Sequence, residues 1–176
     1  MREKALFLDR DGVINIDYGY VSKIEDFEFN EGLFELLHLF ANQGYKLFIV
    51  TNQSGIGRGY YTHQDFLNLT NWMLNELQQQ GLKVEKVEYC FHAPEELCSC
   101  RKPAIGMVSN ILSHYNIDLE NSWLIGDKQS DIDLAHNALI GHTIAVGERT
   151  IENVELFFKT ILEVKSFLEE NHGRIR

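Results

Sequence analysis

Two acidic residues close together follow the first apolar run of the chain. Asp9 and Asp11 come after residues 5–8 and are separated by one residue. Because side chains repeat every second residue along a strand, both carboxylates point to the same side. Two anions this close repel each other unless a cation or a proton lies between them, and Mg2+ with oxygen ligands meets that need. The alternative is a strand end that carries two solvated Asp residues.

Polar residues also end two later apolar runs. Thr51 follows residues 45–50, and Asp127 follows residues 122–125. Since the carboxyl ends of parallel strands form the crevice where open α/β sheets bind ligands, we expect both residues to meet Asp9 there. Asp127 would complete a metal site with Asp9. Asp131 would hold Lys102 or a metal-bound water, or would only start a helix.

All three cysteines lie within eleven positions, in Cys90-x-His92 followed after five residues by Cys98-x-Cys100. An odd number of cysteines in so short a stretch is a poor disulfide framework. Three thiolates and one imidazole suit tetrahedral Zn2+, and four protein ligands with no open position indicate a structural site. The metal would stabilise a loop that is too small to have its own hydrophobic core. The alternative is three buried thiols and a surface histidine.

Two further segments carry groups that suit an anion. Residues 51–54 offer hydroxyl and amide groups and precede three alternating glycines, so backbone N–H groups there can face an anion. This segment matches neither a nucleotide P-loop nor a dinucleotide fingerprint, and its alternative is a flexible turn. Arg101 and Lys102 follow the cysteine segment directly and precede Pro103, which favours a helix start. These cations can bind phosphoryl oxygens or form an ordinary solvated pair.

Length and charge narrow the class of protein. A chain of 176 residues suits one domain, which we place at residues 1–176. The net charge of −10 argues against nucleic acid or an anionic membrane surface as a partner, although it does not exclude a phosphorylated substrate. The sequence shows neither a signal peptide nor an apolar run of membrane-spanning length, so we expect a cytoplasmic protein.

Short β-rich runs alternate with helical patterns, which predicts an α/β fold with a doubly wound, mostly parallel sheet. We expect the last strand to lie at the sheet edge and the last helix to be amphipathic and to pack on one sheet face. The expected strands are residues 4–8, 45–50, 84–89, 122–125 and 142–146, and the expected helices are residues 31–43, 62–80, 104–115, 131–138 and 154–168.

These motifs resemble, in the same order, the four motifs of the haloacid dehalogenase superfamily of phosphatases. They are Asp9-x-Asp11-Gly12 after a strand, Thr51 at the next strand end, Lys102 before a helix, and Gly126-Asp127-x3-Asp131. More narrowly, residues 7–15, residues 51–59 and the Cys/His segment closed by Arg101-Lys102-Pro103 resemble the D-glycero-D-manno-heptose 1,7-bisphosphate 7-phosphatases and the related histidinol-phosphate phosphatases. The resemblance implies a Rossmannoid domain with a minimal cap, in which a zinc-binding loop forms one wall of the site.

The resemblance also implies the role of each residue. Asp9 would be the nucleophile, and Asp11 the general acid and then the base, with a pKa raised relative to that of Asp9. Thr51 and Lys102 would stabilise the phosphoryl oxygens, and Mg2+ would bind Asp9, Asp127 and the backbone carbonyl of Asp11. The residues expected to bind substrate are Asp17, Tyr18, Gly19, Tyr20, Asn52, Gln53, Ser54, Arg101 and Lys128.

The activity implied by the heptose branch is Mg2+-dependent removal of the 7-phosphate of the heptose bisphosphate in ADP-heptose and lipopolysaccharide precursor synthesis. The five-residue gap between His92 and Cys98 resembles the histidinol branch instead. Enzymes of that branch are often fused to a dehydratase domain, whereas we expect a single domain here. A third possibility is a catalytically silent, zinc-bearing binding module. We expect a monomer with a small phosphorylated sugar as its partner.

Overall fold

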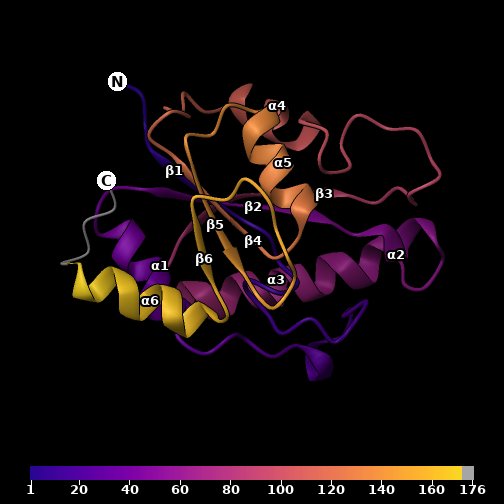
Figure 1. Cartoon of the computed structure of the whole chain (residues 1–176). Helices are drawn as coiled ribbons and strands as arrows, with labels where there is room; N and C mark the ends of the chain where they lie inside the picture. The colour runs from indigo at the N-terminus through magenta and orange to yellow at the C-terminus, as the bar shows by residue number, and fades with distance from the viewer. Residues whose placement is uncertain (172–176) are drawn as a thin grey trace.

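The computed structural model describes residues 1–171, which are built around one six-stranded sheet (Figure 1). The strand order is β3-β2-β1-β4-β5-β6, and every neighbouring pair is parallel. The order runs outward from β1 in both directions, so the predicted doubly wound parallel sheet is confirmed. The strands are β1 (Ala5–Leu8), β2 (Lys46–Asn52), β3 (Val84–Cys90), β4 (Trp123–Gly126), β5 (His142–Val146) and β6 (Leu156–Phe158).

Helices cover both faces of this sheet, as Figure 1 shows, with α4 and α5 on one side and α1, α3 and α6 on the other. Among the described helices, none has the length and hydropathy needed to cross a membrane. The helices are α1 (Leu33–Ala41), α2 (Ser54–Gly57), α3 (His63–Gln79), α4 (Gly106–Leu112), α5 (Gln129–Asn137) and α6 (Ile161–Glu170), with one 3-10 turn, η1 (Ile24–Asp26).

The central strand explains why both faces need cover. All four residues of β1 are fully buried, because a parallel strand flanked by helices has no solvent face. Leu6 and Leu8 belong to the core beneath α1, α3 and α6, whereas Ala5 and Phe7 belong to the core beneath α4 and α5. The alternation of strand side chains therefore divides one apolar run between two cores.

The prediction for residues 142–168 was wrong in two respects. Residues 156–158 form a strand that pairs with β5, so β6 and not β5 is the edge strand. The last helix begins only at Ile161, because the side chain of Thr160 accepts a hydrogen bond from the backbone N–H of Glu163 and so caps it. A three-residue apolar run cannot be assigned to helix or strand by periodicity alone.

Candidate active site

The polar ends of three strands meet at the carboxyl edge of the sheet, as the sequence predicts. Asp9 follows β1, Thr51 lies near the end of β2, and Asp127 follows β4. All three residues are at least nine-tenths buried. A cleft of about 310 Å3 opens at this edge, and Asp9, Asp11 and Lys102 are among the residues that line it. The crevice expected from a parallel sheet is therefore present and carries the predicted carboxylates.

Three carboxylates of this region lie close enough together to share one ion. Oxygen atoms of Asp9, Asp127 and Asp131 lie within 4.8 Å of one another. The Oδ1 atom of Asp127 is buried and has no hydrogen-bond partner among the described residues. A buried carboxylate oxygen without a partner is costly, and a hard divalent cation satisfies it. The donor set therefore fits Mg2+.

Gly12 makes the approach of Asp127 possible. Its φ of +88° is a conformation that other residues rarely adopt. A Cβ atom at this position would lie 2.4 Å from Oδ2 of Asp127, which is too close for any real contact. The glycine after the Asp9–Asp11 pair is therefore required both by the turn and by the carboxylate packed against it.

Lys102 joins two of the carboxylates. Its Nζ atom lies 3.0 Å from Oδ1 of Asp9 and 2.6 Å from Oδ1 of Asp131, and it donates to the carbonyl of Val50. The other oxygen of Asp131 accepts the backbone N–H groups of Asp127 and Lys128. Of the roles considered for Asp131, holding Lys102 is the one that the structure displays, and both of its oxygens are engaged.

The site has more negative than positive charge at its centre. Burial, and after it the charge of Asp131, raises the pKa of Asp9 to about 8, although Lys102 opposes the shift. Burial and Asp131 also raise the pKa of Asp127. Burial alone would lower the pKa of Lys102, but Asp131 and Asp9 outweigh it and raise that pKa. A bound divalent cation would relieve this repulsion between carboxylates.

Asp11 is held differently from the other three carboxylates. Its Oδ1 atom accepts from Arg10 Nη2 at 2.9 Å and Asn15 Nδ2 at 3.0 Å, and its Oδ2 atom accepts from Gln53 Nε2 at 3.0 Å. Burial would raise the pKa of Asp11, but the charge of Arg10 and these hydrogen bonds lower it on balance. In the absence of metal and substrate, the pKa of Asp11 therefore lies below that of Asp9. The expectation that Asp11 has the higher pKa was wrong.

Most of the residues expected to bind substrate line the cleft, with one exception. Tyr18 lies in a neighbouring hollow, and its hydroxyl donates to Glu28 at 2.5 Å. Asn52 lines the cleft, but its amide also forms two hydrogen bonds with the backbone of Lys102 and so holds that residue to β2. The expected residues that do line the cleft are Asp17, Gly19, Tyr20, Asn52, Gln53, Ser54, Arg101 and Lys128.

The sequence analysis missed several residues of the site. Arg149 Nη1 lies 2.7 Å from Oδ2 of Asp127, which leaves the other oxygen of that carboxylate free. Arg58 and Tyr61 line the cleft, and Arg10 is buried beside Asp11. Arg10 could have been suspected from its place between two carboxylates. Arg149 and Asp127 come from separate loops, and no local pattern links them.

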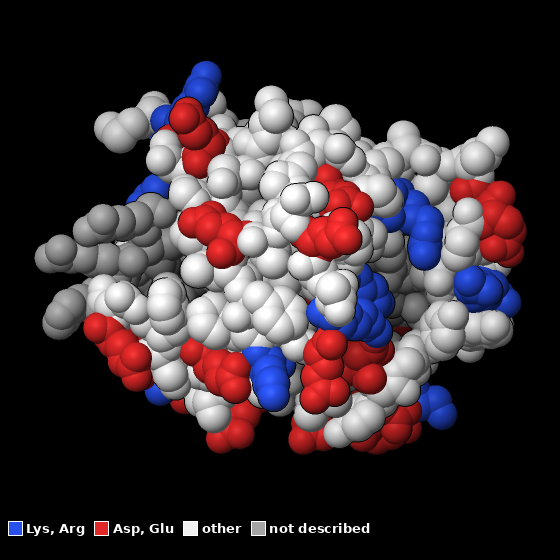
Figure 2. All heavy atoms as spheres, in the orientation of Figure 1, with Lys and Arg blue, Asp and Glu red and all other residues white. Residues whose placement is uncertain are grey.

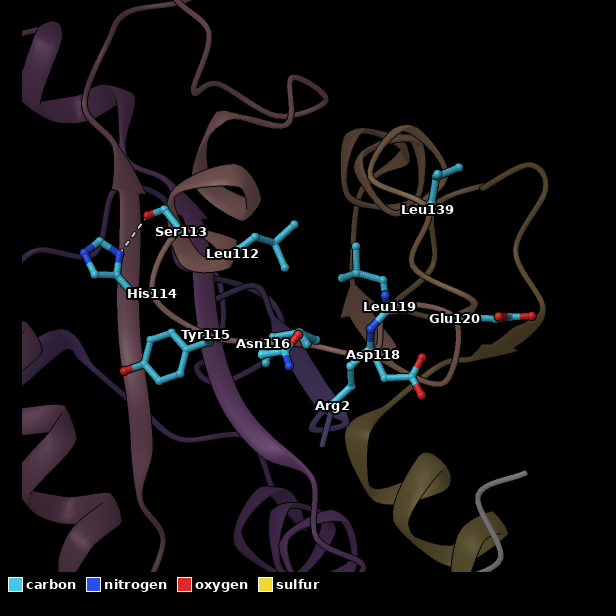
Figure 3. Close-up of a pocket in the computed structure, with 11 residues that line it drawn as sticks. Arg2, Leu112, Ser113, His114, Tyr115, Asn116, Asp118, Leu119, Glu120 and Leu139 are labelled. Carbon is cyan, nitrogen blue, oxygen red and sulfur yellow. Dashed lines mark hydrogen bonds between the residues drawn. The ribbon is translucent and has the colours of Figure 1, made fainter.

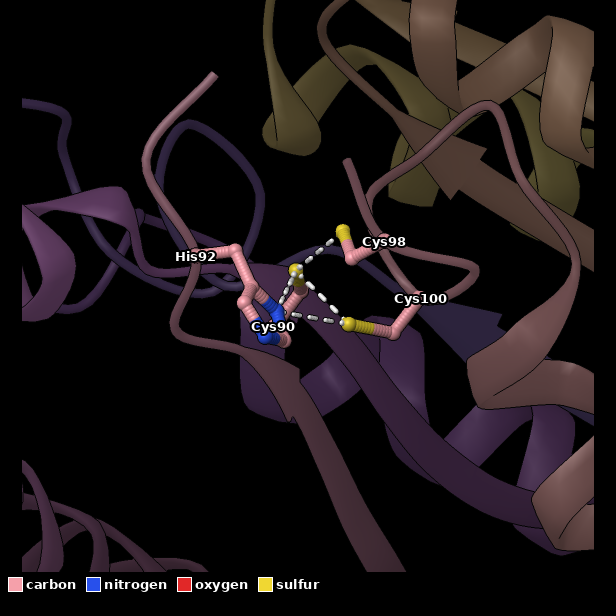
Figure 4. Close-up of side chains that lie close together, drawn as sticks. All are labelled: Cys90, His92, Cys98 and Cys100. Carbon is pink, nitrogen blue, oxygen red and sulfur yellow. Dashed lines mark hydrogen bonds between the residues drawn. The ribbon is translucent and has the colours of Figure 1, made fainter. Parts of the chain in front are cut away.

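The Cys/His segment forms a compact cluster, in which all four side chains point toward one another (Figure 4). The Sγ atom of Cys90 lies 2.9 Å from that of Cys100 and 3.7 Å from that of Cys98. Nδ1 of His92 lies 3.2 Å from the Cys100 sulfur and 3.5 Å from the Cys90 sulfur. The four ligand atoms fit within the span of one metal ion, and the donor set is that of structural zinc.

The loop that carries this cluster is joined to the catalytic edge at several points (Figure 1, after β3). The backbone N–H of Gly57 donates to the carbonyl of Phe91 at 2.9 Å, which connects the loop to α2. The carbonyl of Ser99 accepts from Gly106 at the start of α4. Because Lys102 comes two residues after Cys100, the cluster anchors the segment that supplies the buried lysine.

A second hollow, of about 830 Å3, lies at the opposite edge of the sheet, between α4, the segment before β4 and Leu139 (Figure 3). Two of the polar side chains there have local partners: Asp118 accepts from Asn121, and His114 contacts Ser113. This hollow contains neither of the two candidate metal clusters. The smaller cleft at the carboxyl edge is therefore the candidate active site.

Surface charge agrees with the acidic composition. Figure 2 shows Asp and Glu side chains spread over much of the visible face, with Lys and Arg in smaller groups among them. On this face the described residues form no broad basic surface of the kind that binds a nucleic-acid backbone. The cations that matter for the site are instead local to the cleft.

Comparison with known proteins decides the family. The family model for polynucleotide kinase 3 phosphatase matches residues 9–163. D-glycero-alpha-D-manno-heptose-1,7-bisphosphate 7-phosphatase of Campylobacter jejuni is 49% identical over 172 residues, which cover 97% of this chain and 98% of that protein. The chain belongs to the heptose-1,7-bisphosphate 7-phosphatase family. D-glycero-beta-D-manno-heptose-1,7-bisphosphate 7-phosphatase of Helicobacter pylori strain J99 is 47% identical over 150 residues, which cover 85% of this chain and 86% of that protein.

Solved structures agree with this family assignment. A HAD-like phosphatase from Mesorhizobium loti has a TM-score of 0.81 at 26% identity and covers 96% of this chain and 87% of that one. D,D-heptose 1,7-bisphosphate phosphatase from B. bronchiseptica, complexed with magnesium and phosphate, has a TM-score of 0.82 at 24% identity and covers 96% and 99%. The resemblance to haloacid dehalogenase phosphatases inferred from the motifs is therefore confirmed.

Proposed function

We propose that this protein removes the 7-phosphate of D-glycero-D-manno-heptose 1,7-bisphosphate in a Mg2+-dependent reaction that passes through an aspartyl-phosphate on Asp9. The single observation that carries the proposal is the 49% identity to a phosphatase of this name over almost the whole chain. The arrangement of Asp9 between Lys102 and Asp127 supplies the chemistry.

The proposed roles of the residues come from the motif resemblance, and the contacts of Asp9 and Lys102 support them. The carboxylate of Asp9 attacks phosphorus, and Lys102 and the Thr51 hydroxyl stabilise the charge on the phosphoryl oxygens. Asp11 donates a proton to the leaving alkoxide and later accepts one from the water that hydrolyses the intermediate. Asp9, Asp127 and the backbone carbonyl of Asp11 would hold Mg2+, which would supply positive charge at the reacting phosphoryl group.

Three cations line the cleft beside the catalytic residues, and we assign them to the second phosphate. Arg101 and Lys128 are the residues expected from the sequence, and the lining of the cleft adds Arg58. Lys128 Nζ lies 4.0 Å from Asp17, at the limit of an ion pair, so its charge is only partly neutralised there. A bisphosphate needs a cationic subsite remote from the reacting phosphorus, whereas a monophosphate does not.

The Cys/His cluster is proposed to bind a structural Zn2+ ion. Four protein ligands leave no open position for chemistry. Burial raises the pKa of the Cys90 thiol, so a cation is needed to favour its thiolate. Zinc would then fix the loop that carries Arg101 and Lys102.

We also propose, from the sequence, that the protein is a monomer and is located in the cytoplasm.

A phosphate-release assay on two substrates tests the proposed function. Heptose 1,7-bisphosphate, offered as each C1 anomer because the relatives differ in that part of their names, should be hydrolysed with Mg2+ present. Histidinol phosphate should be a poor substrate, and Asp9→Asn should abolish turnover of both. Preferential hydrolysis of histidinol phosphate would support the alternative suggested by the short His92–Cys98 gap. No hydrolysis of any phosphomonoester would favour a silent binding module.

A further inference from the structure

A buried chain of hydrogen bonds leads from Tyr61 to the catalytic pair. The Tyr61 hydroxyl donates to Oε1 of Gln53 at 2.5 Å. The amide nitrogen of Gln53 donates to Oδ2 of Asp11 at 3.0 Å and to Oγ1 of Thr51 at 2.9 Å. Gln53 is 2% exposed and Tyr61 is 7% exposed, so the hydrogen bonds of Gln53 with Tyr61 and Thr51 are buried, and the one with Asp11 is partly buried at the cleft. Buried polar groups of this kind are costly to leave without partners.

The amide of Gln53 is held between the Tyr61 hydroxyl on one side and Asp11 and Thr51 on the other. An amide presents an acceptor on one side and two donors on the other. The Asp11 carboxylate only accepts hydrogen bonds, so the NH2 group of Gln53 must face it, and Oε1 is left to accept from the Tyr61 hydroxyl. In the reverse orientation an amide oxygen would face a carboxylate, which is repulsive. By donating to Oε1, the tyrosine anchors the far side of the amide whose NH2 group holds Asp11.

The loop after β2 is shaped to receive this tyrosine. A Cβ atom on Gly55 would lie 2.1 Å from Cε1 of Tyr61, so the ring packs directly against the glycine backbone. The carbonyl of Gly55 also accepts from the backbone N–H of Tyr60 at 2.8 Å. Gly55 has no positive φ. Close approach of the tyrosine ring is therefore the reason for a glycine at this position.

We propose that Tyr61 is a positioning residue for the phosphatase reaction, acting through Gln53 to hold the side chain of Asp11 where it serves the leaving group. The proposal rests on the proposed function, because it takes Asp11 as the acid. It assigns Gln53 to the support of Asp11 and Thr51 and not, as the sequence analysis expected, to direct contact with substrate. Both amide hydrogens of Gln53 are already engaged by these two residues.

The test compares two substrates that differ in their need for a proton. The leaving alkoxide of heptose 1,7-bisphosphate must be protonated, whereas the acetate that leaves acetyl phosphate is stable as an anion. Because hydrolysis of the aspartyl-phosphate uses Asp11 with either substrate, the quantity compared is the rate of phosphoenzyme formation in a rapid-quench experiment. Tyr61→Phe should lower this rate on the heptose substrate about tenfold, with about the same KM, and should change it on acetyl phosphate less than about twofold. Gln53→Met, which keeps the chain length without the donor, should show the same selectivity with a larger loss.

Two further variants make the comparison specific. Tyr60→Phe removes the neighbouring hydroxyl from an exposed ring and should leave both rates unchanged. Asp11→Asn should show the same selectivity, with the largest loss on the heptose substrate. Equal losses of Tyr61→Phe on both substrates would indicate a merely structural role, and a higher KM alone would indicate substrate contact; either result overturns the inference. If Asp11→Asn shows no selectivity, the acid role itself fails, and this inference fails with it.

Discussion

At the scale of single residues, each carboxylate of the cleft has its own set of partners. Asp9 and Asp131 share Lys102, Asp127 is bound by Arg149, and Asp11 accepts three side-chain hydrogen bonds. Among these four carboxylates, Asp127 has a fully buried oxygen with no partner in the described part of the chain. Both oxygens of Asp11 and of Asp131 are engaged by neighbouring groups, so Asp127 and Asp9 are the carboxylates with an oxygen left for a metal or for attack.

The sequence was sufficient to predict which residues carry the chemistry, but not all of the residues that hold them. Asp9, Asp11, Thr51 and Asp127 follow recognisable apolar runs, so their convergence follows from sheet topology. Arg149 and Tyr61 lie outside these motifs. Arg149 reaches Asp127 from a loop 22 residues further along the chain. Tyr61 reaches Gln53 only because the chain turns back through α2, and no periodicity in the sequence encodes either contact.

Replacement of Gly12 by alanine tests the packing of Asp127. The Cβ atom would lie 2.4 Å from Oδ2 of Asp127, so the carboxylate must move. Because small displacements of a catalytic group are costly, kcat/KM should fall about 100-fold. Gly44→Ala is the matched control, since Gly44 has a φ of +82° and open space around it. Both variants should melt at a lower temperature, but only Gly12→Ala should lose activity. Equal activity in the two would contradict this account.

At the scale of elements, the parallel strands bring the catalytic residues together and the loops complete the site. The strands and most of the helices could be predicted, because buried strands and amphipathic helices have clear periodicities. The boundary between β6 and α6 could not, since Leu156 and Phe158 fit either pattern and only pairing with β5 decides it. The position of the Cys/His loop beside Lys102 follows from its short spacing in the sequence.

Removal of one zinc ligand tests the role of this loop. Cys98→Ser should lower the zinc content, lower the melting temperature by several degrees and reduce activity, because the loop positions Lys102. Ser99→Ala is the control, since its side chain is exposed and lies outside the cluster. Zinc content, melting temperature and phosphate release are measured on the same samples. A Cys98→Ser protein with full zinc content and normal melting would show that the loop does not depend on this ligand.

At the scale of the whole molecule, the charge of the cleft links metal binding to pH. Burial raises the pKa of Asp9 from 3.8 to about 8, so between these pH values the folded protein binds a proton that the unfolded chain has released. Stability without Mg2+ should therefore fall as pH rises through this range. Asp11 does not oppose the trend at neutral pH, because its pKa is lowered and it is ionised in both states.

Mg2+ should therefore stabilise the protein more at pH 8 than at pH 6. The metal competes with the proton on Asp9, and this competition weakens as the proton concentration falls. The measurement is the rise in melting temperature caused by Mg2+ at each pH. Asp9→Asn should remove most of the pH dependence of that rise. A larger rise at pH 6 would contradict the assignment of Asp9 to the metal.

The most direct test of the central claim is to trap the phosphorylated enzyme. Reaction with heptose 1,7-bisphosphate and Mg2+ is stopped with acid during the first turnover, before the intermediate is hydrolysed, and the protein is treated with borohydride, which reduces an acyl phosphate to an alcohol. Peptide mass spectrometry should then find homoserine at position 9 and Asp at position 11. Unchanged Asp9 at every time point of the first turnover in an active sample, or reduction at another residue, would contradict the account.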